Sequence, residues 1–183
     1  MAFKKLARRV CFAGLDLSSK FDLSAFVLVF PPIERVTVKT PKKQTPEEVR
    51  LRKPVEIEEI VVQEADPNWY VLPWFFVPQN RVDDRVKKDK VEYDVWIRQG
   101  FITPTPGDSV DQEVIRKVIN EQAKLFNIRE IGFDSWNASQ MAKNLQADGF
   151  NLMEVRQGFK TMSEPMKELM ALVLGKKLEH FGN

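Results

Sequence analysis

Two aspartates in this sequence stand where a buried strand is expected to end. Asp16 lies in the stretch G-L-D-L-S-S, with apolar runs on both sides of that stretch, and Asp134 directly follows the run I-R-E-I-G-F. A carboxylate among buried strands is costly unless it pairs with a cation or holds a metal. Carboxylate oxygens favour magnesium or manganese. Asp16 and Asp134 are therefore the candidate metal ligands and catalytic acids. Helix capping is the alternative for Asp134.

The rest of the composition excludes several other kinds of metal, disulfide and nucleotide-binding site. The chain has one cysteine, Cys11, and one histidine, His180, so it can build neither an internal disulfide nor a Cys/His zinc site. It has no G-x-x-x-x-G-K-[S/T] loop and no G-x-G-x-x-G loop. If the protein is an enzyme, we expect carboxylates to carry the chemistry.

The bulk numbers indicate an ordinary globular domain. The 183 residues are 43% hydrophobic and 30% charged, with a net charge of +2, which suits one soluble domain with a sizeable core. No apolar run approaches the length of a membrane span, and we see no secretory signal. The charge is too mild to indicate a nucleic-acid partner without further evidence.

The elements that would position the two aspartates follow from the apolar pattern. Strands are predicted at 10–17, 24–30, 69–77, 128–133 and 150–155, and helices at 80–99, 111–126 and 137–147. A last helix is predicted to begin at a Ser163 cap, with Pro165 in its first turn and an inward apolar stripe of Met166, Leu169, Met170 and Val173. Strands come first and helix–strand alternation follows, which predicts a mixed sheet.

A crossover through helix 111–126 would bring the two aspartates together. It would lay strand 128–133 parallel to the first strand, with both carboxylates at the carboxyl edge of the sheet, where open α/β sheets present their sites. Neighbouring strands lie about 4.8 Å apart. Two such carboxylates can share a metal ion, and a pair of ions about 3.5–4 Å apart suits in-line phosphoryl displacement.

Basic residues supply candidate contacts to a phosphate backbone. The segment 33–66 is predicted to be an inserted hairpin or loop. Lys42, Lys43 and Arg52 lie in its exposed part, and Arg156 and Lys160 lie beside the supposed site. Lysine and arginine hold phosphates without reading sequence. The alternative for each is a solvated surface charge.

Five blocks, in order, resemble the nuclease domain of the tailed-phage terminase large subunit. They read GLDLSSKFDLSAFVLVFP, WYVLPWFFVP, DVWIRQGFITPTPGDSVD, IGFDSWNASQ and VRQGFKTMSEPMKEL. The resemblance implies one α/β nuclease-like domain over 1–183 with a ribonuclease-H-like fold. Its mixed sheet would have antiparallel strands 1–3, parallel strands 4–5, the order 3-2-1-4-5, and flanking helices.

The resemblance also implies a function and roles for particular residues. The family cuts concatemeric double-stranded DNA in genome packaging, with two magnesium or manganese ions held by acidic residues. Asp16 would be the first-strand acid and Asp134 the fourth-strand acid. Asn137 and Gln157 would support these ligands or contact DNA. The alternatives are helix capping for Asn137 and an ordinary polar loop residue for Gln157.

Two departures from the family shape the expectation for this chain. The family's third acid lies on a helix beyond the region where this sequence ends, and the ATPase motor is missing. We therefore expect a fragment that is a poor nuclease alone. Its partners would be double-stranded DNA and, in the full assembly, the ATPase domain, the small terminase subunit and the portal, in the cytoplasm of a bacterial host and away from membranes.

Two other functions are weighed against the nuclease. A noncatalytic module that binds DNA or the portal would explain the missing third acid. An actin-like kinase shares the core fold, but it needs glycines in its first hairpin to admit phosphates. Here no glycine follows Gly14 in that hairpin, which disfavours a kinase.

Overall fold

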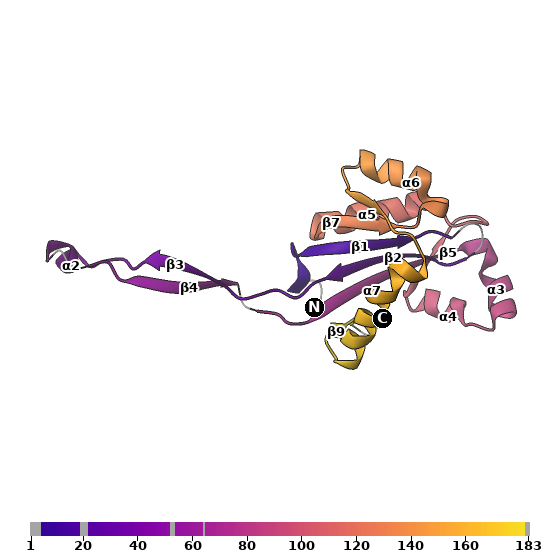
Figure 1. Ribbon diagram of the computed structural model, residues 1–183. Coiled ribbons are helices and arrows are strands. Elements are labelled where there is room, and N and C mark those ends of the chain that lie inside the picture. Colours follow the sequence, from indigo (N-terminus) through magenta and orange to yellow (C-terminus); the bar gives the residue numbers. More distant parts are fainter. Residues whose placement is uncertain (1–4, 19–21, 52–53, 64, 182–183) are drawn as a thin grey trace. The chain divides into compact units, whose positions relative to one another are not determined.

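The computed structural model describes residues 5–18, 22–51, 54–63 and 65–181 (Figure 1). The chain divides into two compact units, one of residues Pro32–Asn68 and one of the remainder. Within the described ranges, no helix has the length and apolar character needed to cross a membrane.

The larger unit is built on a mixed sheet. Its central strands are β1 (Val10–Asp16), β2 (Ser24–Phe30), β5 (Trp69–Pro78), β7 (Asn127–Phe133) and β8 (Leu152–Glu154). They lie in the order β5-β2-β1-β7-β8 (Figure 1). β2 is antiparallel to β1 and β5, β7 is parallel to β1, and β8 is parallel to β7. The predicted mixed sheet and its 3-2-1-4-5 order are confirmed.

Two short strands extend the sheet beyond β5. β6 (Ile102–Thr105) pairs in parallel with the end of β5, and β9 (Leu178–Glu179) pairs in parallel with its beginning. Neither strand follows from the sequence pattern, because the Thr-Pro-Thr-Pro-Gly run at 103–107 is typical of a break between elements. β6 tolerates Pro104 because it lies at an edge, where a missing N–H breaks no ladder.

Two helices, α5 (Gln112–Leu125) and α6 (Ser135–Ala147), cover one face of this sheet. Ile115 and Ile119 of α5 and Met141 and Leu145 of α6 are buried in one core with the alternate residues Cys11, Ala13 and Leu15 of β1. The Asp111 side chain caps α5 by accepting a hydrogen bond from the Glu113 N–H at 2.9 Å. Helix α5 is the crossover that makes β7 parallel to β1.

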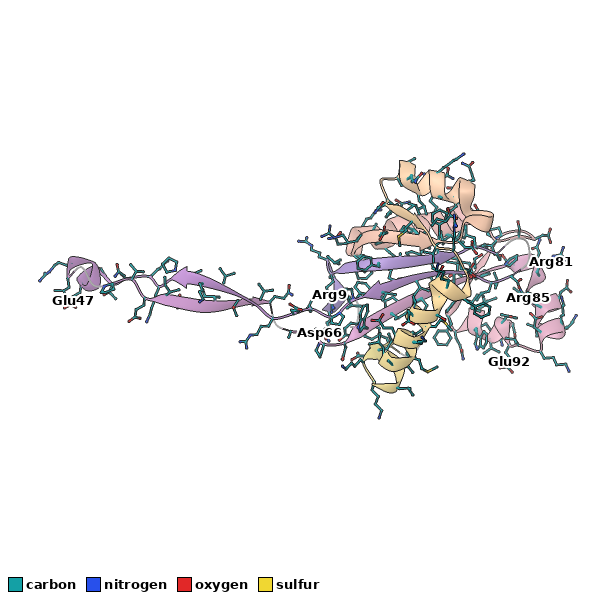
Figure 2. All side chains as sticks on the ribbon, in the orientation of Figure 1. Arg9, Glu47, Asp66, Arg81, Arg85 and Glu92 are labelled. Carbon is teal, nitrogen blue, oxygen red and sulfur yellow. The ribbon has the colours of Figure 1, made fainter. Side chains whose placement is uncertain are left out.

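The helical character predicted for 80–99 is found, but it is divided among separate elements and does not form one continuous helix. That segment forms a short 3₁₀ turn, η1 (Gln79–Arg81), and two helices, α3 (Val82–Asp89) and α4 (Tyr93–Arg98). Lys90 ends α3 in the left-handed conformation (φ 56°), with its N–H bonded to the Val86 carbonyl. Arg85 lies on α3 (Figure 2), and its guanidinium binds the Asp22 carboxylate at 2.7 Å, which ties this helix to the β1–β2 connection.

The last helix also differs from its prediction. Helix α7 spans Phe159–Leu174, so it begins after an extended Gly158 and not at Ser163. Pro165 lies inside the helix and has no N–H to offer the carbonyl one turn before it. The predicted inward stripe is exposed, at 47–60% for Met166, Leu169, Met170 and Val173. Amphipathic spacing showed that a helix forms but not whether anything covers its apolar side.

The smaller unit is a two-stranded hairpin. β3 (Val36–Pro41) pairs antiparallel with β4 (Ile57–Gln63), and a five-residue helix, α2 (Pro46–Arg50), lies between them. At the base of the unit, Ile33 and Asp66 exchange two backbone hydrogen bonds of 2.9 Å. The two ends of this insertion are therefore held beside each other.

Candidate active site

The structure places Asp16 and Asp134 at neighbouring strand ends. Leu15 of β1 is the register partner of Phe133 of β7. Asp16 directly follows Leu15, and Asp134 directly follows Phe133. Both residues line one open pocket of about 380 Å³, together with Gln157. The topology thus brings three of the predicted site residues to the carboxyl edge of two parallel strands.

The alternation of β1 explains why Asp16 faces this pocket. Cys11, Ala13 and Leu15 are buried against α5 and α6, while Phe12, Gly14 and Asp16 face the opposite side, where they line the pocket. A shift of one residue in register would turn Asp16 into the core. The apolar residues of β1 therefore fix the side on which the carboxylate lies.

The same alternation on β7 adds residues that the sequence analysis missed. Glu130 and Gly132 lie on the pocket side with Asp134. Their spacing of two residues along a strand was the signal that could have identified them. Met153 of β8 and Met162 of α7 also line the pocket. A residue from the first turn of α7 thus reaches the open face of the sheet.

Of the remaining predicted residues, the structure describes Arg156 and Lys160 in the larger unit and Lys42 and Lys43 in the hairpin unit. Arg156 and Lys160 are exposed and flank Gln157 in the chain, but they do not line the pocket. Lys42 and Lys43 belong to the separate hairpin unit, where Lys42 pairs with Glu56 at 3.1 Å. Arg52 and the side chain of Asn137 lie outside the described residues.

The oxygen donors of the pocket suit a hard divalent cation. Two carboxylates and the amide oxygen of Gln157 are the ligand types that magnesium and manganese take. Across the described ranges, no group of three or more histidine, cysteine, aspartate or glutamate residues is close enough to hold a metal. The pocket therefore fits a site with few protein ligands, which would leave coordination positions for water or substrate.

Asp134 also stands at the start of a helix. α6 begins at Ser135, so Asp134 directly precedes the N-terminus of a helix, where acidic side chains are favourable. Helix capping and metal binding are compatible, because a carboxylate has two oxygens with several lone pairs.

Comparison with known proteins adds to this geometry. Residues 49–183 match the family described as terminase large subunit, endonuclease domain. The chain belongs to this family. It is 32% identical over 175 residues to the terminase large subunit of Enterobacteria phage HK97, which covers 94% of this chain and 28% of the relative. It is 29% identical over 119 residues to protein YmfN of Escherichia coli K12, covering 62% of this chain and 26% of that protein.

A solved structure has the same fold. The crystal structure of the HK97 bacteriophage large terminase superimposes with a TM-score of 0.69 at 29% identity, covering 98% of this chain and 33% of that one. This chain of the terminase endonuclease family therefore spans about a third of the solved protein and less than a third of the curated relatives.

Proposed function

We propose that this domain is a metal-dependent endonuclease that hydrolyses phosphodiester bonds of concatemeric double-stranded DNA during phage genome packaging. One observation carries the proposal. In a chain of the terminase endonuclease family, Asp16 and Asp134 line a single pocket at the ends of two adjacent parallel strands.

The chemistry assigned to the residues follows from their charge. Asp16 and Asp134 would hold magnesium or manganese, with Gln157 as an additional oxygen donor or a contact to DNA. When bound there, such ions would supply Lewis-acid polarisation of a phosphoryl oxygen and a more acidic water as the nucleophile. Without a cation, the two carboxylates would repel the phosphate backbone. Metal is therefore needed both for binding at the scissile phosphate and for hydrolysis.

The partners and the location belong to the proposal as well. Double-stranded DNA would be the substrate. The terminase ATPase domain, the small terminase subunit and the portal would be the assembly partners, in the cytoplasm of the bacterial host. Lys42, Lys43, Arg52, Arg156 and Lys160 are proposed as phosphate contacts, and Asn137 as a residue that supports the site.

A noncatalytic role is the second candidate. The pocket contains Asp16, Asp134 and, farther along the strand, Glu130, but the described residues offer no metal-binding group of three acids. A site with so few ligands would hold metal weakly. The domain would then bind DNA or the portal in the assembled motor without cutting DNA.

Nicking of supercoiled plasmid separates the two candidates. Wild-type chain is incubated with magnesium or manganese, with and without chelator, beside Asp16→Asn and Asp134→Asn. We expect cleavage that the chelator abolishes and that either variant reduces by more than about a hundredfold, because even residues behind the metal ligands typically contribute 10–100-fold. Asp83→Asn, a change of an exposed acid on α3, is the matched control. DNA binding without any cleavage would support the noncatalytic role.

A further inference from the structure

The candidate pocket extends along the sheet beyond the two aspartates. It includes Asp16 and Gly14 and continues to Phe12 on β1, four residues from Asp16. At about 3.3 Å per residue, that is roughly 13 Å along the strand. Only one end of the pocket has the aspartate pair, so the proposed metal chemistry leaves the greater part of its length without a role.

The floor of this extension is bare backbone. Gly14 and Gly132 are direct register partners on β1 and β7, and both line the pocket. A Cβ atom added at Gly14 would meet no atom within 4 Å, while one at Gly132 would come within 3.1 Å of a Val155 methyl carbon. The floor at Gly14 is therefore open space that a side chain would fill.

The walls of the extension are apolar. Phe12 is 44% exposed and Met153 is 48% exposed, and Val27 and Met162 also line the pocket. This is the composition expected for a flat, uncharged ring system, because aromatic and apolar side chains stack on the faces of bases.

A carboxylate lies at the far end. Glu130 is the register partner of Phe12 and lines the pocket, with one of its oxygens accepting a hydrogen bond from the Asn151 amide at 3.4 Å. A carboxylate accepts hydrogen bonds from exocyclic amino groups of bases, and it repels phosphate. The polar end opposite the aspartates therefore suits the amino edge of a base and not a second phosphate.

We propose that this extension receives one unpaired nucleobase of the DNA strand, next to the scissile phosphate, which would lie at the metal site of Asp16 and Asp134. The inference rests on the proposed nuclease function and deepens it. The base ring lies over Gly14 and Gly132 and stacks against Phe12, and its amino group points to Glu130. The whole pocket, with the aspartate end included, has a volume of about 380 Å³, which falls in the usual range for small-ligand pockets, about 300–1,000 Å³.

The proposal makes the domain prefer DNA that is already locally unpaired. Taking a base out of a duplex costs unpairing and unstacking energy, and this cost is smallest for a mismatched or unpaired base. The substrate class is therefore double-stranded DNA with a distorted or opened position at the cut.

Fluorescence anisotropy with labelled duplexes tests this preference. One duplex is fully matched, and the other has a single extra adenine in its centre. Binding is measured in calcium, which takes the same oxygen ligands, and a gel verifies that the DNA stays intact. We expect the bulged duplex to bind at least about fivefold tighter, the lower end of what base–aromatic stacking provides.

Two variants act on the extension without touching the aspartates. Gly14→Val fills the floor with a residue that suits a strand, and Phe12→Ala removes the ring. Each is expected to bring the affinity for the bulged duplex to the level of the matched duplex measured with the same variant. Val10→Ala is the matched control, because Val10 is exposed on the same strand but lies outside the pocket. Thermal melting of each variant checks that it is folded.

The outcomes separate this inference from the proposed function. Equal binding of both duplexes by the wild type, or an unchanged preference in both folded variants, overturns the base pocket and leaves the nuclease proposal intact. Failure to bind any DNA overturns both. Metal-dependent cleavage, followed in parallel on the plasmid, tests the nuclease proposal without reference to the bulge.

Discussion

At the scale of single residues, the alternation along β1 decides which side chains are buried in the core and which line the pocket. On β1, odd-numbered residues from Cys11 to Leu15 form the core, and even-numbered residues from Phe12 to Asp16 form the pocket. The chemistry of each side chain therefore follows from its position in the repeat of two. Cys11 and Asp16 lie on one strand, but Cys11 is buried in the core and Asp16 is exposed to solvent.

Cys11 should be chemically inert in the folded protein. Burial raises the pKa of its thiol to about 12, so at pH 8 roughly one thiol in ten thousand is ionised, and only the thiolate is a good nucleophile. We expect a disulfide reagent such as DTNB to release almost no chromophore from native protein and one equivalent after addition of urea. Cys11 is the one cysteine in the sequence, so the signal has a single source. Rapid stoichiometric reaction without urea would contradict its burial.

The sequence could identify Asp16 and Asp134 as candidates because a carboxylate after an apolar run is conspicuous. It did not identify Phe12 or Glu130 as pocket residues. Phe12 reads as core in an apolar run, and only the register with β7 shows that it faces the open side. Glu130 reads as a surface charge until β7 is placed beside β1. Pairing between strands distant in sequence supplies this information.

At the scale of elements, an ion pair joins α5 to the turn that follows α6. The Arg116 guanidinium donates two hydrogen bonds, of 2.7 and 2.6 Å, to the two oxygens of Asp148, and the Asn120 amide donates a third, of 2.9 Å. These bonds, with that from Arg116 the largest cause, lower the pKa of Asp148 to about 2. The two helices that cover the core are thereby tied to each other.

This pair should make stability depend on pH in the acid range. Because the folded pKa of Asp148 is depressed, its contribution is fully present above the unfolded value near 3.9 and is lost as the pH falls toward 2. Asp148→Asn should therefore lower the urea midpoint at pH 7 and lower it only about half as much at pH 3. Glu121→Gln, at an exposed position on α5, is the control. An equal decrease for Asp148→Asn at both pH values would contradict the ion-pair account.

The sequence predicted α5 and α6 well, because their apolar spacing matches the face that packs against the core. α5 and α6 have the expected spacing, and their inward residues Ile115, Ile119, Met141 and Leu145 are buried. α7 has equally clear spacing, but its stripe is exposed. The burial of a helix's apolar face depends on which other element packs against it. The sequence of the helix does not contain this information. The left-handed Lys90 that divides α3 from α4 likewise had no sequence signal comparable to a glycine.

At the scale of the whole molecule, the chain contains two units with separate contacts. The larger unit has the core and the candidate pocket. The hairpin unit has its own strand pairing and its own closing bridge between Ile33 and Asp66. The strand signals of 36–38 and 55–62 were readable in the sequence, whereas the pairing that closes the unit was not.

Replacement of residues 34–65 by Asn-Gly should therefore leave the larger unit folded. Ile33 and Asp66 already form an antiparallel bridge, and Asn-Gly favours the tight turn that joins such residues. We expect Tm to change by less than about 2 °C, as for surface changes of about 0.5 kcal/mol or less. Loss of Lys42, Lys43 and Arg52 should reduce the salt slope of DNA binding by about 2, because each proposed phosphate contact accounts for about 1 and Lys42 is already paired with Glu56. A large drop in Tm would show that the hairpin supports the core, and an unchanged slope would show that its lysines do not contact DNA.

Manganese binding by calorimetry tests the central claim most directly, because it requires neither DNA nor turnover. The wild-type chain is titrated beside Asp16→Asn, Asp134→Asn and the Asp83→Asn control. We predict that the wild type binds manganese, that each pocket variant weakens binding by at least about tenfold, and that the control binds like the wild type. Equal binding by the wild type and Asp16→Asn, or no binding by the wild type, would contradict the assignment of Asp16 and Asp134 as metal ligands.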